Sequence, residues 1–149
     1  MADKRVVTGI DDEGKSYVLA IDELPTDGMA VLWTYEPSSI DDLIAQVSED
    51  EVATSVEPTP GVTTWVRAEL PPGPPSGAGT PGIDENGFHT TRTLDVINLL
   101  SGRLTLLLDR DEVDLSPGDV VVQQATRHAW RNDGPEPAVI IVAMHRPTV

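Results

Sequence analysis

Two stretches in the second half of the chain decide the fold. They read GFHTTRTLDVINLLSG over residues 87–102 and LSPGDVVVQQATRHAWRN over residues 115–132. Each contains a run of Val, Ile or Leu, which favour strands, and each has glycine or proline where the chain must turn. Each also carries one histidine, His89 in the first and His128 in the second. The pattern indicates a β-protein in which polar side chains gather at the ends of strands.

Alternation along these strands predicts which side chains face inward. Successive side chains of a strand point to opposite faces, so every second residue shares a face. The face that starts at His89 is polar first and apolar later; it comprises Thr91, Thr93, Asp95, Ile97 and Leu99. On the later strand His128 shares a face with Trp130. We therefore expect a barrel whose mouth is polar and whose base is packed.

Both stretches resemble the paired motifs of the cupin superfamily. The first motif has two histidines one residue apart, then a carboxylate and a glycine; the positions that match it are His89, Asp95 and Gly102. Thr91 stands where the second histidine is expected, and Asp95 stands where the family usually has Glu. The positions that match the second motif are Pro117, Gly118, Asp119, His128 and Asn132. The resemblance covers roughly residues 62–146.

This resemblance implies an all-β fold, a cupin β-barrel of the jelly-roll type. We expect one structural domain, with the barrel over residues 62–149 and an N-terminal extension of strands and one short helix over residues 1–61. The helix is expected over residues 38–47, where apolar side chains share one helical face. Strands are expected over residues 6–8, 16–21, 29–35, 63–70, 93–100, 103–109, 112–115, 119–123, 128–131 and 138–144.

The histidines and the carboxylate suggest a metal site in the barrel mouth. His89, Asp95 and His128 make two imidazoles and one carboxylate, the ligand set of facial-triad iron sites. The same set suits Zn²⁺, Mn²⁺ or Ni²⁺. Against it, Thr91 removes one nitrogen donor and Asp95 is shorter than Glu, so a metal-free site is the other interpretation.

Without a metal, the same residues support proton transfer. His128 is the favoured proton carrier, with His89 as the alternative, because imidazole titrates near neutral pH, and Asp95 would orient the ring. Thr91 and Thr93 offer hydroxyl groups to a substrate, Trp130 and Ile97 bound an apolar pocket, and Arg127 is a candidate clamp for a substrate carboxylate.

Two classes of function remain. The first is a small-molecule enzyme, an isomerase, cyclase, dehydratase or dioxygenase of the cupin type. The second is a cupin that binds or senses a small ligand without catalysis. The Pro- and Gly-rich residues 71–82 cannot pair as a central strand. They form either a flap over the mouth or a loop without a role.

Composition limits the partners and the compartment. The formal net charge of −15 argues against nucleic acid and anionic membranes, which need clustered Lys and Arg. Residues 1–60 hold 14 acidic and three basic side chains, so the barrel itself is closer to neutral. The chain has no cysteine and no apolar run long enough to span a membrane, and we expect a cytoplasmic protein. By resemblance we also expect a homodimer.

Overall fold

Nine strands make up the regular structure of residues 3–23 and 57–148, the part of the chain that the computed structural model describes. They are β1 (Lys4–Ile10), β2 (Ser16–Glu23), β3 (Thr63–Leu70), β4 (Leu94–Ser101), β5 (Leu104–Leu108), β6 (Glu112–Leu115), β7 (Val120–Gln124), β8 (His128–Arg131) and β9 (Ala138–His145). The all-β class is thereby confirmed. The expected strand over residues 29–35 and the expected helix over residues 38–47 lie outside the described residues.

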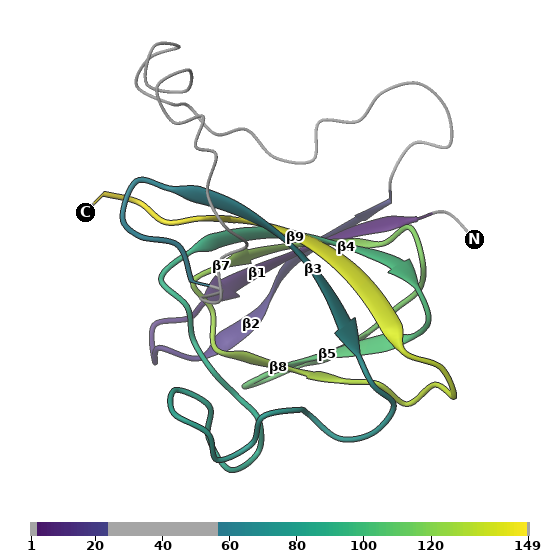
Figure 1. The fold of residues 1–149 in the computed structure, drawn as a ribbon. Coiled ribbons are helices and arrows are strands. Elements are labelled where there is room, and N and C mark those ends of the chain that lie inside the picture. Colours follow the sequence, from purple (N-terminus) through teal and green to yellow (C-terminus); the bar gives the residue numbers. More distant parts are fainter. Residues whose placement is uncertain (1–2, 24–56, 149) are drawn as a thin grey trace, which may run out of the picture.

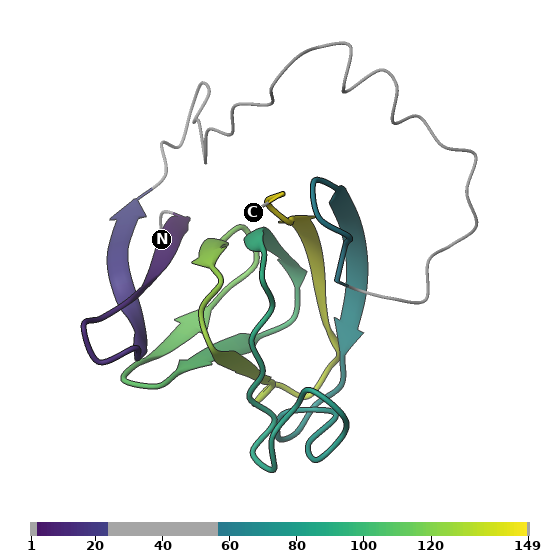
Figure 2. The same ribbon diagram turned by 90° about the vertical axis from the view of Figure 1, so that its left-hand side faces the viewer.

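The strands form two sheets that face each other. Six strands pair in the order β2-β1-β7-β4-β9-β3, and three pair in the order β6-β5-β8. Figures 1 and 2 show the larger sheet curving over the smaller one. The inner faces of both sheets carry the apolar residues, so the core lies between them. It includes Val6, Leu99, Leu106, Val121 and Ile140, each at most 4% exposed.

Alternation explains why the larger sheet has one buried face. Along β4, every second residue from Asp95 is buried: Asp95, Ile97 and Leu99. Asp95 is the one acidic residue of these three. Strand β9 alternates in the same way, with Ile140, Val142 and Met144 buried. Trp65 on β3 points the other way and is 72% exposed, outside the core.

Gly102 ends β4 at a position that only glycine suits. Its φ of +84° lies in the left-handed region, which side chains of L-residues rarely adopt. A Cβ atom there would also lie 2.8 Å from Cα of Ala138. The glycine expected from the first motif is therefore explained by backbone geometry.

The N-terminal strand is part of the larger sheet. β1 pairs antiparallel with β2 on one side and parallel with β7 on the other, where Val6 lies opposite Val121. Thr8 is fully buried and its hydroxyl lies 2.9 Å from the hydroxyl of Thr126. β1 thus contributes core residues to the barrel.

Within the described residues no helix could cross a membrane.

Asp119, in the Pro-Gly-Asp turn of the second motif, binds the start of β1 through hydrogen bonds and an ion pair. Its carboxylate accepts hydrogen bonds from the backbone N–H of Lys4 at 2.9 Å and of Ser116 at 2.8 Å. The ammonium group of Lys4 adds an ion pair at 2.6 Å. Asp119 is only 3% exposed, and removing its carboxylate takes the hydrogen-bond acceptor from two backbone N–H groups and the partner from one ammonium group.

We therefore expect Asp119→Ala to lower the free energy of unfolding by about 2–3 kcal/mol. Urea denaturation should show a lower midpoint with an unchanged slope. Asp114→Ala is the matched control, because the exposed Asp114 accepts a single hydrogen bond from Thr105. It should cost less than about 1 kcal/mol. Equal losses in the two variants would contradict this assignment.

The segment between β3 and β4 is held at both ends. The backbone of Gly73 exchanges two hydrogen bonds with that of Asn132, and the side chain of Asn132 donates to the carbonyls of Leu70 and Glu136. At the other end His89 exchanges two backbone hydrogen bonds with His128. The Pro- and Gly-rich stretch over residues 71–82 therefore leaves the barrel and returns to it at fixed points.

Candidate functional site

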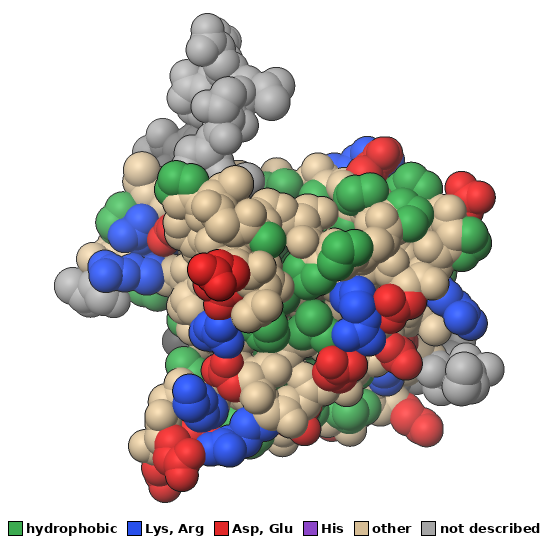
Figure 3. Space-filling view, turned by 90° about the horizontal axis from the view of Figure 1, so that it is seen from below, with side chains coloured by type: hydrophobic (Ala, Val, Ile, Leu, Met, Phe, Trp, Pro, Cys, Tyr) green, Lys and Arg blue, Asp and Glu red, His purple; other side chains and the backbone are tan. Residues whose placement is uncertain are grey.

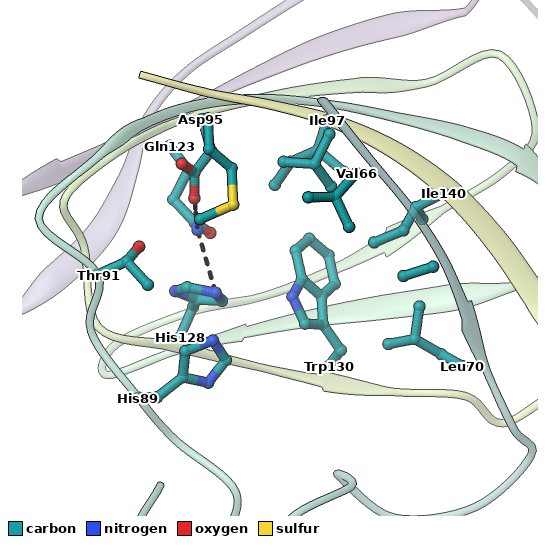
Figure 4. A pocket seen from close by; sticks show the side chains of 13 residues that line it. Val66, Leu70, His89, Thr91, Asp95, Ile97, Gln123, His128, Trp130 and Ile140 are labelled. Atoms are coloured by element: carbon teal, nitrogen blue, oxygen red, sulfur yellow. Dashed lines mark hydrogen bonds between the residues drawn. The ribbon is translucent and has the colours of Figure 1, made fainter. Parts of the chain in front are cut away.

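A pocket of about 220 Å³ lies between the two sheets. Most of its lining is apolar and comes from β3, β4, β8 and β9, and polar side chains gather at one end (Figure 4). The apolar residues are Val66, Ala68, Leu70, Ile97, Trp130, Ile140, Val142 and Met144, and the polar ones are His89, Thr91, Asp95, Gln123 and His128. The pocket therefore suits a mainly apolar molecule with one polar end.

Asp95 and Gln123 lie side by side on the inner face of the larger sheet. They are direct cross-strand partners in the pairing of β4 with β7, and Met144 of β9 is the partner of Asp95 on its other side. The amide nitrogen of Gln123 donates a hydrogen bond of 3.2 Å to Oδ2 of Asp95. Both side chains are almost completely buried, Asp95 at 3% and Gln123 at 1% exposed.

His128 enters from the smaller sheet and both of its ring nitrogens are engaged. Nδ1 lies 2.9 Å from the carbonyl oxygen of Thr126, which can only accept, so Nδ1 carries the proton. Nε2 then has a free electron pair and accepts from the Gln123 amide at 3.1 Å (Figure 4). Burial, and after it the neighbouring charge of His89, lowers the pKa of His128 to about 3. The ring is therefore neutral at physiological pH.

The sequence led us to expect Asp95 to orient the imidazole of His128, but Thr126 does so instead. The backbone carbonyl of Thr126 holds Nδ1, and Gln123 stands between His128 and Asp95. Gln123 was not among the predicted site residues. Its inward phase, shared with the core residue Val121, and its polarity within a Val-rich strand were the available signals.

His89 lies against His128 and outside the nine strands; its backbone pairs only with that of His128, at the start of β8. Its ring centroid is 4.3 Å from that of His128, with the ring planes at 57°. Strand β4 begins only at Leu94, five residues after His89. Asp95, Ile97 and Leu99 therefore share a face of β4 as predicted, but His89 is not on that strand. Asp95 and His89 therefore approach the pocket from opposite sheets.

Three buried polar atoms of this cluster have no hydrogen-bond partner among the described residues. They are Nδ1 of His89, Oδ1 of Asp95 and Oε1 of Gln123. Unpaired buried polar groups are uncommon and costly, about 1–3 kcal/mol each, so they mark a place where a ligand group or water is needed. Burial also raises the pKa of Asp95 above its ordinary value, against the opposing effects of hydrogen bonding by Thr93 and then by Gln123.

The polar cluster does not fit a metal ion as it lies. Within residues 3–23 and 57–148, no three His, Asp or Glu side chains converge to hold one. The Nε2 electron pair of His128 and Oδ2 of Asp95 both accept from the Gln123 amide. The hydroxyl of Thr91, at the second-histidine position, accepts from Thr93 at 2.8 Å. The predicted ligands His89, Asp95 and His128 are thus neighbours without being a ready coordination sphere.

Six of the eight predicted site residues line the pocket: His89, Thr91, Asp95, Ile97, His128 and Trp130. Trp130 packs edge-on to His128 with ring centroids 5.8 Å apart, on the inner face as alternation predicts. Thr93 is buried beside Thr91 but is not part of the lining. Sequence reasoning also missed the contribution of β3 and β9, because no local pattern shows which strands close the barrel.

Arg127 lies outside the pocket lining and is already paired. Its guanidinium bonds to the carboxylates of Asp84 and Asp109 and covers the ring of Phe88, 4.2 Å from its centroid. These contacts fix the turn that leads into His89. Figure 3 shows basic and acidic side chains similarly intermingled on the face seen from below. An arginine held by two carboxylates is poorly suited to clamp a substrate carboxylate.

The fold and the pocket define a small β-barrel protein with a site between its two sheets. The chain belongs to the cupin superfamily: the Cupin domain family (Cupin_2) matches residues 68–144, just over half of the chain. No curated protein matches it.

The chain is similar to several solved structures, two of which are the following. The Cupin_2 domain of an XRE family transcriptional regulator from Enterobacter cloacae is 21% identical, with 59% of this chain and 73% of that chain covered and a TM-score of 0.35. A cupin protein from Bacteroides fragilis is 13% identical, with 65% and 83% covered and a TM-score of 0.45.

Proposed function

We propose that this cupin binds a small, mainly apolar molecule in the barrel and moves a proton on it through Asp95. The observation that carries the proposal is a buried carboxyl group with a raised pKa in the lining of an apolar pocket, with one oxygen unpaired. Perturbed carboxyl groups of this kind are typical of acid–base sites. The reactions that need no more than this are isomerisation and dehydration.

The pocket sets the class of ligand. An apolar cavity of ~150 Å³ accommodates benzene, so 220 Å³ suits one ring with a short polar substituent. None of the described residues that line the pocket is Lys or Arg, so no ammonium or guanidinium group there would balance an anionic group. A neutral molecule with a carbonyl or hydroxyl group meets both conditions.

The polar side chains have separate roles in this proposal. Oδ1 of Asp95 takes the proton from a carbon next to the substrate carbonyl and returns it at another atom. Nδ1 of His89 and the hydroxyl of Thr91 lie at the same end of the pocket and can bond to the substrate oxygen. His128 holds Gln123 in place and carries no proton, because its neutral ring is fully engaged.

A second candidate function is ligand binding without catalysis. It is favoured by the burial of the unpaired oxygens, since Oδ1 of Asp95 and Oε1 of Gln123 are covered by neighbouring groups in the free protein. A substrate would have to displace these groups to reach Asp95. A ligand that only fills the apolar end would not.

Proton exchange distinguishes the two functions without knowledge of the product. A panel of single-ring carbonyl compounds is first screened for stabilisation of the protein in thermal unfolding. Those that bind are incubated with the protein in D₂O with a chelator, and loss of the C–H signal next to the carbonyl is followed by NMR. We expect exchange above the buffer rate. Binding without exchange would favour the second candidate, and no binding by any compound would contradict both.

A further inference from the structure

The amide group of Gln123 occupies the place between two groups that would serve as metal ligands. Its nitrogen lies 3.2 Å from Oδ2 of Asp95 and 3.1 Å from Nε2 of His128, so one nitrogen joins the two sheets across the barrel (Figure 4). Gln123 is 1% exposed, so its amide group is held between the two sheets and away from solvent.

The chemistry of its partners fixes which way the amide points. The carbonyl of Thr126 accepts from Nδ1 of His128, so Nε2 of the neutral ring can only accept. The atom of Gln123 that faces it must therefore be the nitrogen and not the oxygen. The two N–H groups of this nitrogen are the donors for Nε2 and for the Asp95 carboxylate, and an N–H dipole directed at a site repels a cation.

We propose that Gln123 replaces the metal ion in this cupin and is the residue that makes the site metal-independent. It donates to the lone pairs that a divalent cation would take from Asp95 and His128. Thr91 completes the effect, because its hydroxyl supplies no nitrogen ligand and is bonded to Thr93. This inference does not depend on proton transfer by Asp95, since metal binding is measured without activity.

Four proteins test the proposal: the native chain, Gln123→Ala, Thr91→His and the double variant. Each is titrated with Co²⁺, whose visible absorption reports nitrogen and oxygen ligands, and with Zn²⁺ by calorimetry. We expect no stoichiometric binding to the native chain or to Thr91→His. The double variant should bind one ion at least 100-fold more tightly than either, because His128, Asp95 and the new imidazole are then free to coordinate.

Two further proteins keep the test independent of folding. Gln124→Ala is the matched control, since the amide of Gln124 bonds to the backbone of Thr8 and not to the pocket cluster; it should bind no metal. Gln123→Leu keeps the volume of the side chain and, combined with Thr91→His, should still gain affinity if Gln123→Ala unfolds.

Three results would overturn the proposal. One is a single tight Zn²⁺ or Co²⁺ ion on the native chain that is lost in Asp95→Asn. Another is a site created by Thr91→His alone, which would make Thr91 the deciding residue. The third is the absence of any gain in folded double variants.

Discussion

Replacing Asp95 with Asn should lower the rate of proton exchange on a bound carbonyl compound by ~10²–10⁴-fold, the usual contribution of a general acid–base group. Affinity for the compound should change little. An Asn side chain has nearly the shape of Asp and its oxygen can still accept the hydrogen bond from Gln123, so the cluster keeps its geometry. It has no proton to give or take near neutral pH, so only the chemical step is lost.

Two controls separate this effect from general damage. Asp133→Asn makes the same chemical change at an exposed carboxylate that pairs with Arg131, and it should exchange at the native rate. His128→Asn should lose far less activity than Asp95→Asn, because the ring of His128 is neutral and already bonded. Native exchange by Asp95→Asn would refute the role of Asp95 and direct attention to His89.

Acid should destabilise the protein through His128. In the unfolded chain this histidine titrates near its ordinary pKa of 6.5, whereas in the folded protein burial lowers the pKa to about 3. Between these values the unfolded state binds a proton that the folded state refuses. The stability contributed by the neutral ring is therefore complete above about pH 6.5 and is lost as the pH falls toward 3. The loss is ~1.4 kcal/mol per pH unit, on the order of 5 kcal/mol in total.

The difference between native protein and His128→Asn isolates this effect from other titrating groups. Asn can donate to Thr126 with its amide nitrogen in the place of Nδ1; it ends short of the Nε2 position and does not titrate. Free energies of unfolding from urea denaturation at several pH values between 7 and 4 should converge or cross for the two proteins as the pH falls. Asp95 has a raised pKa and so contributes in the opposite direction, with stability falling as the pH rises, but it is present in both proteins. Parallel pH curves would contradict the assignment.

The sequence predicted the strands of the barrel closely because their signals are local. Strand β6 (Glu112–Leu115) and strand β8 (His128–Arg131) have the predicted bounds, and β4 and β9 differ by one residue at their ends. Alternation and turn residues determine such bounds. The parallel pairing of β1 with β7 was not predicted, since no local pattern records which distant strands are neighbours.

The sequence predicted which residues form the site but not the hydrogen bonds and ion pairs between them. Motif spacing identified His89, Asp95 and His128, which all line the pocket. It could not show that Gln123 joins two of them, because that contact depends on the distance between the sheets. Nor could it show that Arg127 is neutralised by Asp84 and Asp109, which lie far from it in the chain.

The position of β1 also affects the order in which the molecule can fold. Lys4 and its partner Asp119 are 115 positions apart, so forming that contact closes a long loop of chain at a cost in conformational entropy. During synthesis β1 leaves the ribosome early, yet its parallel neighbour β7 follows much later. Until then the edge of β1 that later pairs with β7 is unpaired, and an unpaired edge favours association with other chains. We therefore expect completion of the six-stranded sheet to be a slow step of folding, and the step at which dependence on chaperones and loss to aggregation are greatest.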